Sequence, residues 1–199
     1  MSQFNETAKE WDTPRNRERA ADVGNLIRSA APLSAETSSF GYGTGTRLLS
    51  FELHDDIGSA TLAANSEDML KVLNDKISSH SIENMRAASL NLLEDPLPSD
   101  QFNLIYTMLP LHHTRGVRQL LGKFYELLGD GGFLCLADLE LDEDDSFPGY
   151  DADLVHKIFD HNDLASITKN AGFKDISFIQ AAKWSIRFMK AQRNSSLFF

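Results

Sequence analysis

Three glycines at alternate positions, in the stretch Phe40-Gly41-Tyr42-Gly43-Thr44-Gly45, constrain this chain more than any other feature. Glycine adopts positive φ angles readily and lets a ligand approach the backbone closely. The stretch leads into a segment with a helical pattern, residues 46–53, whose first N–H groups would face a polar ligand. By itself, such a turn is either a plain loop or a nucleotide-binding turn.

An alternation of strand and helix patterns surrounds this turn. A lead-in helix is predicted between Phe4 and Pro32, with Asp12 or Thr13 as its N-cap. Two strand patterns close the chain without a helix between them, which predicts an antiparallel hairpin. The whole order predicts an α/β fold with a mostly parallel, doubly wound sheet. The predicted strands are a short segment after Pro32 that ends in the glycine turn, then 58–63, 85–90, 102–108, 133–139, 174–181 and 184–191. The later helices are 67–77, 115–128 and 162–170.

Composition limits the class of protein. A length of 199 residues predicts one domain over 1–199, with 1–34 as a helical lead-in. No apolar run approaches a membrane span, and the start lacks a secretory signal, so we expect a cytoplasmic protein without membrane contact. The net charge of −10 argues against a nucleic-acid partner. Cys135 lies in an apolar run and is predicted to be a core residue.

Ligands of such sheets bind where parallel strands end. Four stretches of the chain follow predicted strands and are therefore expected around one cleft. They are the glycine turn, residues 63–65, Asn91-Leu92 and residues 108–113.

The order and spacing of these stretches resemble the class I S-adenosylmethionine-dependent methyltransferases, in particular the small single-domain type that acts on small molecules. The likeness runs from about Phe4 to Gln192 and includes 95–106 leading into 111–113, then 124–134, Ala137-Asp138-Leu139 and Ala171-Gly172-Phe173. The resemblance implies a seven-stranded Rossmann-like sheet, S-adenosylmethionine as cofactor and a small-molecule acceptor. It implies cofactor contacts at Ser39, Gly41, Tyr42, Gly43, Gly45, Ala64, Asn65, Asn91, Leu92 and Met108.

Four positions depart from the family pattern because acids are replaced by neutral residues. Ser39 stands where the family has an acid near the methionine amine, and Ala64 where it has the acid that holds the ribose hydroxyls. Asn91 replaces the acid near the adenine, and Asn103 replaces one in the fourth strand. Losing a carboxylate costs about 1.5–3 kcal/mol per hydrogen bond to a charged group. Tyr42 stands where the family often has a small residue, and it either restricts the pocket or offers a π-face to the sulfonium.

His112 and His113 are the candidate catalytic bases, because they follow the fourth strand and could take a proton from an acceptor hydroxyl. The alternative is that they satisfy a loop, and Asp138 either orients substrate or caps a turn. One cysteine with scattered histidines predicts no metal site. The glycine spacing disfavours a nicotinamide dehydrogenase, since Thr46 stands where its third glycine belongs. The sequence thus predicts a methyltransferase. The alternative is a catalytically degenerate relative that binds a metabolite or a partner subunit.

Overall fold

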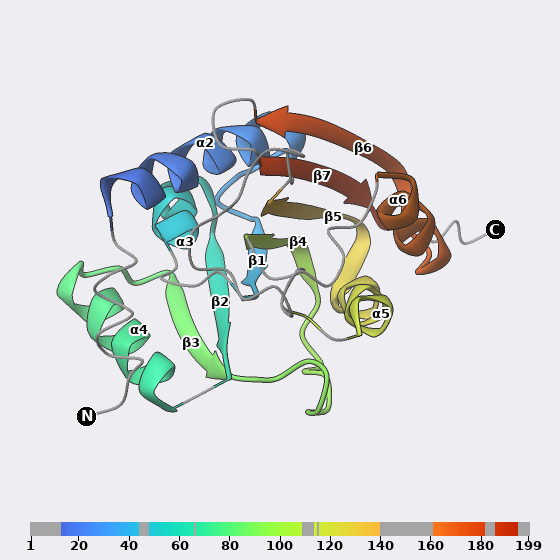
Figure 1. The fold of residues 1–199 in the computed structure, drawn as a ribbon. Helices are drawn as coiled ribbons and strands as arrows, with labels where there is room; N and C mark the ends of the chain where they lie inside the picture. Colours follow the sequence, from blue (N-terminus) through green and yellow to red (C-terminus); the bar gives the residue numbers. More distant parts are fainter. Residues whose placement is uncertain are drawn as a thin grey trace, which may run out of the picture.

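Seven strands form one sheet in the order β3-β2-β1-β4-β5-β7-β6 (Figure 1). The computed structural model describes residues 13–43, 48–65, 67–108, 114, 116–139, 161–181 and 186–194. The strands are β1 (Ser38–Gly41), β2 (Ser59–Ala64), β3 (Met85–Ser89), β4 (Phe102–Met108), β5 (Leu128–Leu139), β6 (Lys174–Ala181) and β7 (Ile186–Gln192). The helices are α2 (Pro14–Ala30), α3 (Leu48–Leu53), α4 (Glu67–Ser79), α5 (Val117–Leu127) and α6 (His161–Asn170), with a 3₁₀ turn η1 at His54–Asp56.

Strands β1 to β5 are parallel to one another, and β7 pairs antiparallel with both β5 and β6. The predicted doubly wound sheet and its closing hairpin are therefore confirmed. The alternation of strands and helices predicts this topology because each parallel pair needs a crossover connection.

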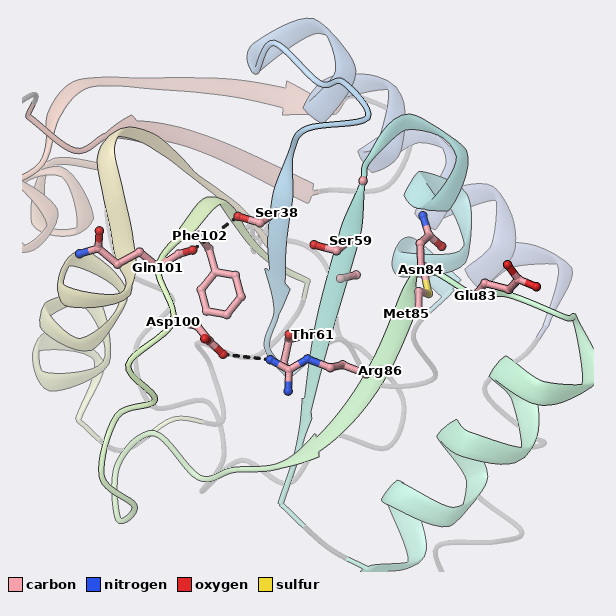
Figure 2. Close-up of a pocket in the computed structure, with 12 residues that line it drawn as sticks. Ser38, Ser59, Thr61, Glu83, Asn84, Met85, Arg86, Asp100, Gln101 and Phe102 are labelled. Carbon is pink, nitrogen blue, oxygen red and sulfur yellow. Dashed lines mark hydrogen bonds and ion pairs between the residues drawn. The ribbon is translucent and has the colours of Figure 1, made fainter.

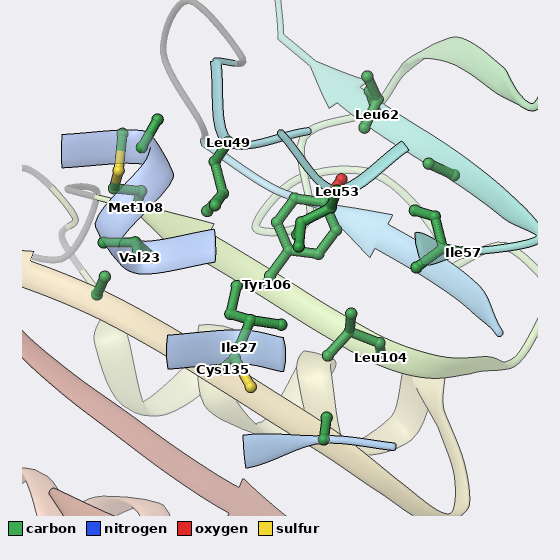
Figure 3. Close-up of a cluster of buried hydrophobic side chains, with 14 of the residues drawn as sticks. Val23, Ile27, Leu49, Leu53, Ile57, Leu62, Leu104, Tyr106, Met108 and Cys135 are labelled. Carbon is green, nitrogen blue, oxygen red and sulfur yellow. The ribbon is translucent and has the colours of Figure 1, made fainter. Parts of the chain in front are cut away.

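Helices cover both faces of the sheet and divide the core in two (Figure 1). On one face α2, α3 and α4 pack around Ile27, Leu53, Leu73 and Tyr106, which form part of a first buried cluster (Figure 3). On the other face α5 and α6 pack on a second cluster that includes Phe40 and Phe124.

The lead-in helix begins where the sequence predicts. Thr13 is the N-cap of α2, its hydroxyl accepts the N–H of Asn16 at 3.2 Å, and Pro14 occupies the first turn. Phe4, Asp12 and the rest of the predicted lead-in before Thr13 lie outside the described residues. Ala20, Val23 and Ile27 face the first cluster at helical spacing.

The predicted helix 115–128 and strand 133–139 leave residues 129–132 between them, but these residues are part of β5. Leu128 pairs with Phe102 and Phe133 with Leu104, so one strand carries extra residues and the register shifts between them. Gly131 has φ 74°, and a Cβ on Gly132 would lie 2.9 Å from the Gly129 carbonyl oxygen. The glycines therefore allow a bulge within the strand instead of ending it. The other predicted elements agree with the observed ones to within a few residues.

Candidate functional site

The carboxyl ends of the parallel strands bring most of the predicted cofactor residues to one edge. In register, Gly41 at the end of β1 lies beside Leu62 of β2 and Tyr106 of β4, and Ala64 lies beside Ser89. Tyr42-Gly43, Asn65, Asn91-Leu92 and Met108 follow or end these strands, and we call this rim the carboxyl edge. Gly45, His112 and His113 fall outside the described residues.

Gly41 and Gly43 are glycines for different reasons. A Cβ on Gly41 would lie 2.9 Å from Leu62 Cδ2 and 3.1 Å from the Tyr106 ring, so core packing excludes a side chain. Gly43 has φ 59°, a backbone conformation that disfavours most side chains. Core packing therefore requires the glycine at position 41, whereas the backbone conformation favours the glycine at position 43.

Ser39 is fully buried and its hydroxyl donates to the Ser59 carbonyl at 3.0 Å. Beside it, burial raises the pKa of Tyr106 to about 12, although the nearby hydroxyls of Ser50 and Ser39 act in the opposite direction. The Tyr106 ring lies in the first cluster near Leu53 (Figure 3). The hydroxyl of Ser39 thus binds within the core, and its contact with a cofactor amine stays a prediction.

The other replaced acids also have structural partners. Ala64 is buried and its carbonyl accepts the N–H of Leu90 at 3.0 Å, while Asn65 is exposed. Asn103 Oδ1 accepts the backbone N–H of Ser38 at 2.9 Å and its hydroxyl at 3.0 Å. Asn103 therefore fixes β4 to the start of β1, at the opposite edge of the sheet from the glycine turn.

Residues 91–95 form a compact turn after β3. Asn91 Oδ1 accepts the N–H of Leu93 at 3.1 Å, and the Asn91 carbonyl accepts the N–H groups of Glu94 and Asp95 at 3.0 and 2.8 Å. The carboxylate of Asp95 in turn accepts the N–H of Asn91 at 2.7 Å. The side chain of Asn91 therefore closes its own turn.

Tyr42 connects the glycine turn to this turn. Its ring stacks on Phe40 with centroids 6.4 Å apart and meets the edge of Phe124 at 5.6 Å. Burial raises the pKa of Tyr42, a hydrogen bond from the Leu92 backbone lowers it, and the charge of Glu94 raises it. The Tyr42 side chain is half-buried.

Sequence reasoning missed Thr107. Its hydroxyl is buried one residue before the end of β4 and has no hydrogen bond within the part of the chain that the structure describes. A threonine inside an apolar strand pattern gives no signal, because threonine is a common strand former. Met108 and Asp138, at the ends of β4 and β5, are both buried.

Residues 39–136 match the family described as methyltransferase domain. These residues form a class I methyltransferase domain. They include the glycine turn, the turn after β3 and all of β4, so the match covers the described part of the carboxyl edge. No curated protein matches the chain.

Solved structures share the fold of this methyltransferase domain over most of the chain. A SAM-dependent methyltransferase from Aquifex aeolicus is 15% identical, with a TM-score of 0.78 over 94% of this chain and 97% of its own. The [4+2]-cyclase SpnF is 12% identical, with a TM-score of 0.72 over 88% and 81%. Haemonchus contortus phosphoethanolamine N-methyltransferase 2, in complex with S-adenosyl-L-methionine, is 15% identical, with a TM-score of 0.73 over 87% and 52%. At these identities the likeness shows the fold.

The methyltransferase domain has a concave region at the amino ends of its strands, which we call the amino-end hollow (Figure 2). It measures ≈ 620 Å³ and lies against Ser59, Thr61, Arg86 and Phe102. Arg86 and Asp100 pair there at 3.0 Å, and both are exposed. The hollow is thus at the opposite edge of the sheet from the glycine turn.

Three further observations concern metal binding, the single cysteine and membrane spans. Among the described residues, no three His, Cys, Asp or Glu side chains are grouped so that they could hold a metal ion. Cys135 is buried, as predicted, and burial raises the pKa of its thiol to about 12, so it is not a thiolate nucleophile. No helix in the described ranges is long and apolar enough to cross a bilayer.

Proposed function

We propose that this protein transfers a methyl group from S-adenosylmethionine to a small-molecule acceptor. The methyltransferase domain and its fold support S-adenosylmethionine-dependent methylation as the general chemistry. The observation that carries the proposal is the family match from β1 to β5, which spans the strands whose ends form the carboxyl edge. The net charge of −10 supports a small acceptor over a nucleic acid.

Small and neutral residues at the carboxyl edge support the proposal that the cofactor binds there. Gly43 has a positive φ and no side chain to cover the backbone, and Ala64 has a small apolar side chain where the ribose is expected. When bound, S-adenosylmethionine supplies an activated methyl group on a sulfonium. The protein's part is to position the acceptor in line and to exclude water, which supplies most of the rate enhancement in such transfers.

Two kinds of side chain are proposed to act on the acceptor. His112 or His113, which follow β4, would accept the proton of an acceptor hydroxyl. Asp138 and Thr107 lie buried at neighbouring strand ends and would orient the acceptor through hydrogen bonds.

Calorimetric titration with S-adenosylmethionine and S-adenosylhomocysteine tests the cofactor. A ligand that binds the folded state raises the apparent stability by RT ln(1 + [L]/Kd), about 2.7 kcal/mol at a hundredfold excess over Kd. No heat and no stabilisation at millimolar ligand would overturn the proposal. Transfer of labelled methyl groups to a panel of small hydroxy and amino compounds then tests the acceptor class.

A charge variant tests the binding position. Ala64→Asp restores a carboxylate at the end of β2 and is expected to tighten binding about tenfold, through a charge-assisted hydrogen bond. Ser59→Asp places the same charge at the exposed start of the same strand and is the matched control. Equal effects of the two variants would show that the ribose does not lie at Ala64.

A further inference from the structure

The amino-end hollow lies beside a connection that carries no helix. Residues 90–101 join β3 to β4 without one, although a crossover between parallel strands usually contains a helix that covers the sheet. The last residues of this connection, Asp100 and Gln101, line the hollow. Its volume of ≈ 620 Å³ falls within the usual range of small-molecule sites, about 300–1,000 Å³. The hollow is therefore large enough to hold a small ligand.

A buried hydroxyl faces this hollow. The side chain of Thr61 is 7% exposed, and Thr61 lies beside Arg86 in the register of β2 and β3 (Figure 2). Its hydroxyl makes no hydrogen bond within the described residues. A buried hydroxyl without a partner destabilises a protein, and such a group is typical of a position where a ligand supplies the partner. Thr61 therefore indicates a binding site within the hollow.

The other polar groups of the hollow are of opposite kinds. Arg86 only donates hydrogen bonds and Asp100 only accepts them, and the two pair through a single Nη2 to Oδ2 contact at 3.0 Å. Both are exposed, so a ligand can reach the remaining donors of the guanidinium and the remaining lone pairs of the carboxylate. The Ser59 hydroxyl and the Glu83 carboxylate also line the hollow, and within the described ranges neither side chain makes a hydrogen bond or an ion pair.

This set of groups favours an uncharged ligand with several hydroxyls. A hydroxyl both donates and accepts, so neighbouring ligand hydroxyls can bond to Arg86 and to Asp100 at the same time. An anionic group would be attracted by Arg86 but repelled by Asp100 and Glu83. A cationic group would be repelled by Arg86, and because it only donates it could not use the guanidinium donors.

We propose that the amino-end hollow binds an uncharged polyhydroxylated compound, of the class of sugars and cyclitols. Arg86 donates to one ligand hydroxyl and Asp100 accepts from its neighbour. Thr61 pairs with a further hydroxyl at the floor of the hollow. This site is at the opposite edge of the sheet from the glycine turn, so the proposal does not depend on methyl transfer.

Titration of the full chain with D-glucose, D-ribose and myo-inositol, followed by amide NMR spectra, tests this inference. Glucosamine and phosphorylated glucose are the charged comparison ligands. The proteins are the wild type, Thr61→Val, Thr61→Ser, Arg86→Met and Arg17→Met. Arg17 is a matched control, because it is an exposed arginine on α2 and does not line the hollow. Thermal unfolding of each variant confirms that it is folded.

At least one uncharged compound should shift the amide signals of the residues that line the hollow, with a Kd of a few millimolar or lower. Thr61→Val and Arg86→Met should each weaken its binding about five- to tenfold, since each removes a hydrogen-bonding partner of the ligand. Thr61→Ser keeps the hydroxyl, and it should stay within about twofold of the wild type, as should Arg17→Met. Both charged compounds should bind more weakly than glucose.

The inference would be overturned if no uncharged compound shifted these signals at tens of millimolar, or if either Thr61→Val or Arg86→Met left the affinity unchanged. Tighter binding of phosphorylated glucose would make the hollow a site for anions, and tighter binding of glucosamine a site for cations. Either result would overturn the proposed ligand class. None of these results bears on the proposed function, which is tested separately with S-adenosylmethionine.

Discussion

Gly41 shows how one residue can serve packing at a position that a motif assigns to a ligand. Gly41→Ala would bring a Cβ within 2.9 Å of Leu62 Cδ2 and 3.1 Å of the Tyr106 ring. We expect it to lower the free energy of unfolding by about 1–3 kcal/mol, as overpacking does. Gly122→Ala, on α5 with nothing within 4 Å, is the control and should raise it by about 0.5–1 kcal/mol. Urea denaturation measures both, and equal effects would contradict this account of Gly41.

Titration of Tyr106 is expected to lower the free energy of unfolding at alkaline pH. Its pKa is about 12 in the folded state against an ordinary value of 10.0, so the folded state keeps the proton longer than the unfolded chain. Stability from this group is complete below pH 10 and falls by about 1.4 kcal/mol per pH unit between about 10 and 12. Cys135, whose pKa is also about 12, contributes a second loss of stability, which begins near pH 9.

Unfolding in urea at pH values from 8 to about 11.5 tests the contribution of Tyr106. Tyr106→Phe should remove part of the alkaline slope, whereas Cys135→Ala should leave the tyrosine part intact. An unchanged slope in Tyr106→Phe would show that the phenol does not titrate with the folding transition.

Residue positions could be predicted from the sequence, but the directions of side chains could not. The sequence places Ser39 just before the glycine turn, and Ala64 and Asn91 at or just after strand ends. The structure has Ser39 within β1, Ala64 at the end of β2 and Asn91 just after β3. The binding of Ser39 to the Ser59 carbonyl depends on the register between β1 and β2, which no local pattern encodes. The closure of the 91–95 turn by Asn91 depends on a local turn geometry that asparagine permits but does not impose.

At the scale of elements, Arg193 ties the end of β7 to the junction of α5 and β5. Its Nη1 donates to the carbonyls of Tyr125 at 3.2 Å, Glu126 at 3.4 Å and Leu128, and its guanidinium lies 5.1 Å from the Tyr125 ring centroid. These carbonyls are at the end of α5, where the last C=O groups of a helix have no N–H donors within the helix. Arg193 therefore satisfies groups that would otherwise remain unpaired.

Arg193→Met should lower the free energy of unfolding by about 1–3 kcal/mol, because it leaves half-buried carbonyls without donors. Arg193→Lys should restore little of this, since an ammonium cannot reproduce the planar fork of donors. Arg86→Met breaks the exposed pair with Asp100 and should cost less than about 1 kcal/mol. A loss at Arg193 no larger than that at Arg86, in urea denaturation, would contradict this role.

The order of elements was predictable because the hydrophobic period changes from strand to helix along the chain. The main failure is at the start of β5, where residues 129–132 resemble a loop through their three glycines. The sequence does not show that Phe102 pairs with Leu128, and that long-range pairing keeps the segment in the sheet. Tertiary pairing overrides local turn preference here.

The molecule as a whole has two different edges on one sheet. The carboxyl edge holds the glycine turn and the residues matched to the methyltransferase family, while the amino-end hollow is lined by Thr61, Arg86 and Phe102. Ligand-binding and catalytic residues of parallel sheets lie at the carboxyl ends of the strands, because the loops there can vary without disturbing the sheet. The carboxyl edge and the amino-end hollow are therefore expected to contribute separately to binding and stability.

Thr61→Val tests this separation within a single strand. Thr61 is 7% exposed and faces the amino-end hollow (Figure 2), and its hydroxyl makes no hydrogen bond in the described ranges. Replacing it with an isosteric apolar group should change the free energy of unfolding by less than about 1 kcal/mol.

The affinity of Thr61→Val for S-adenosylhomocysteine should stay within about twofold of the wild-type value, because sites that share no partner contribute independently. Calorimetry on Thr61→Val and Ala64→Asp, three positions apart on β2, makes the comparison. A change of more than about fivefold at Thr61 would show that the amino-end hollow is coupled to the cofactor site.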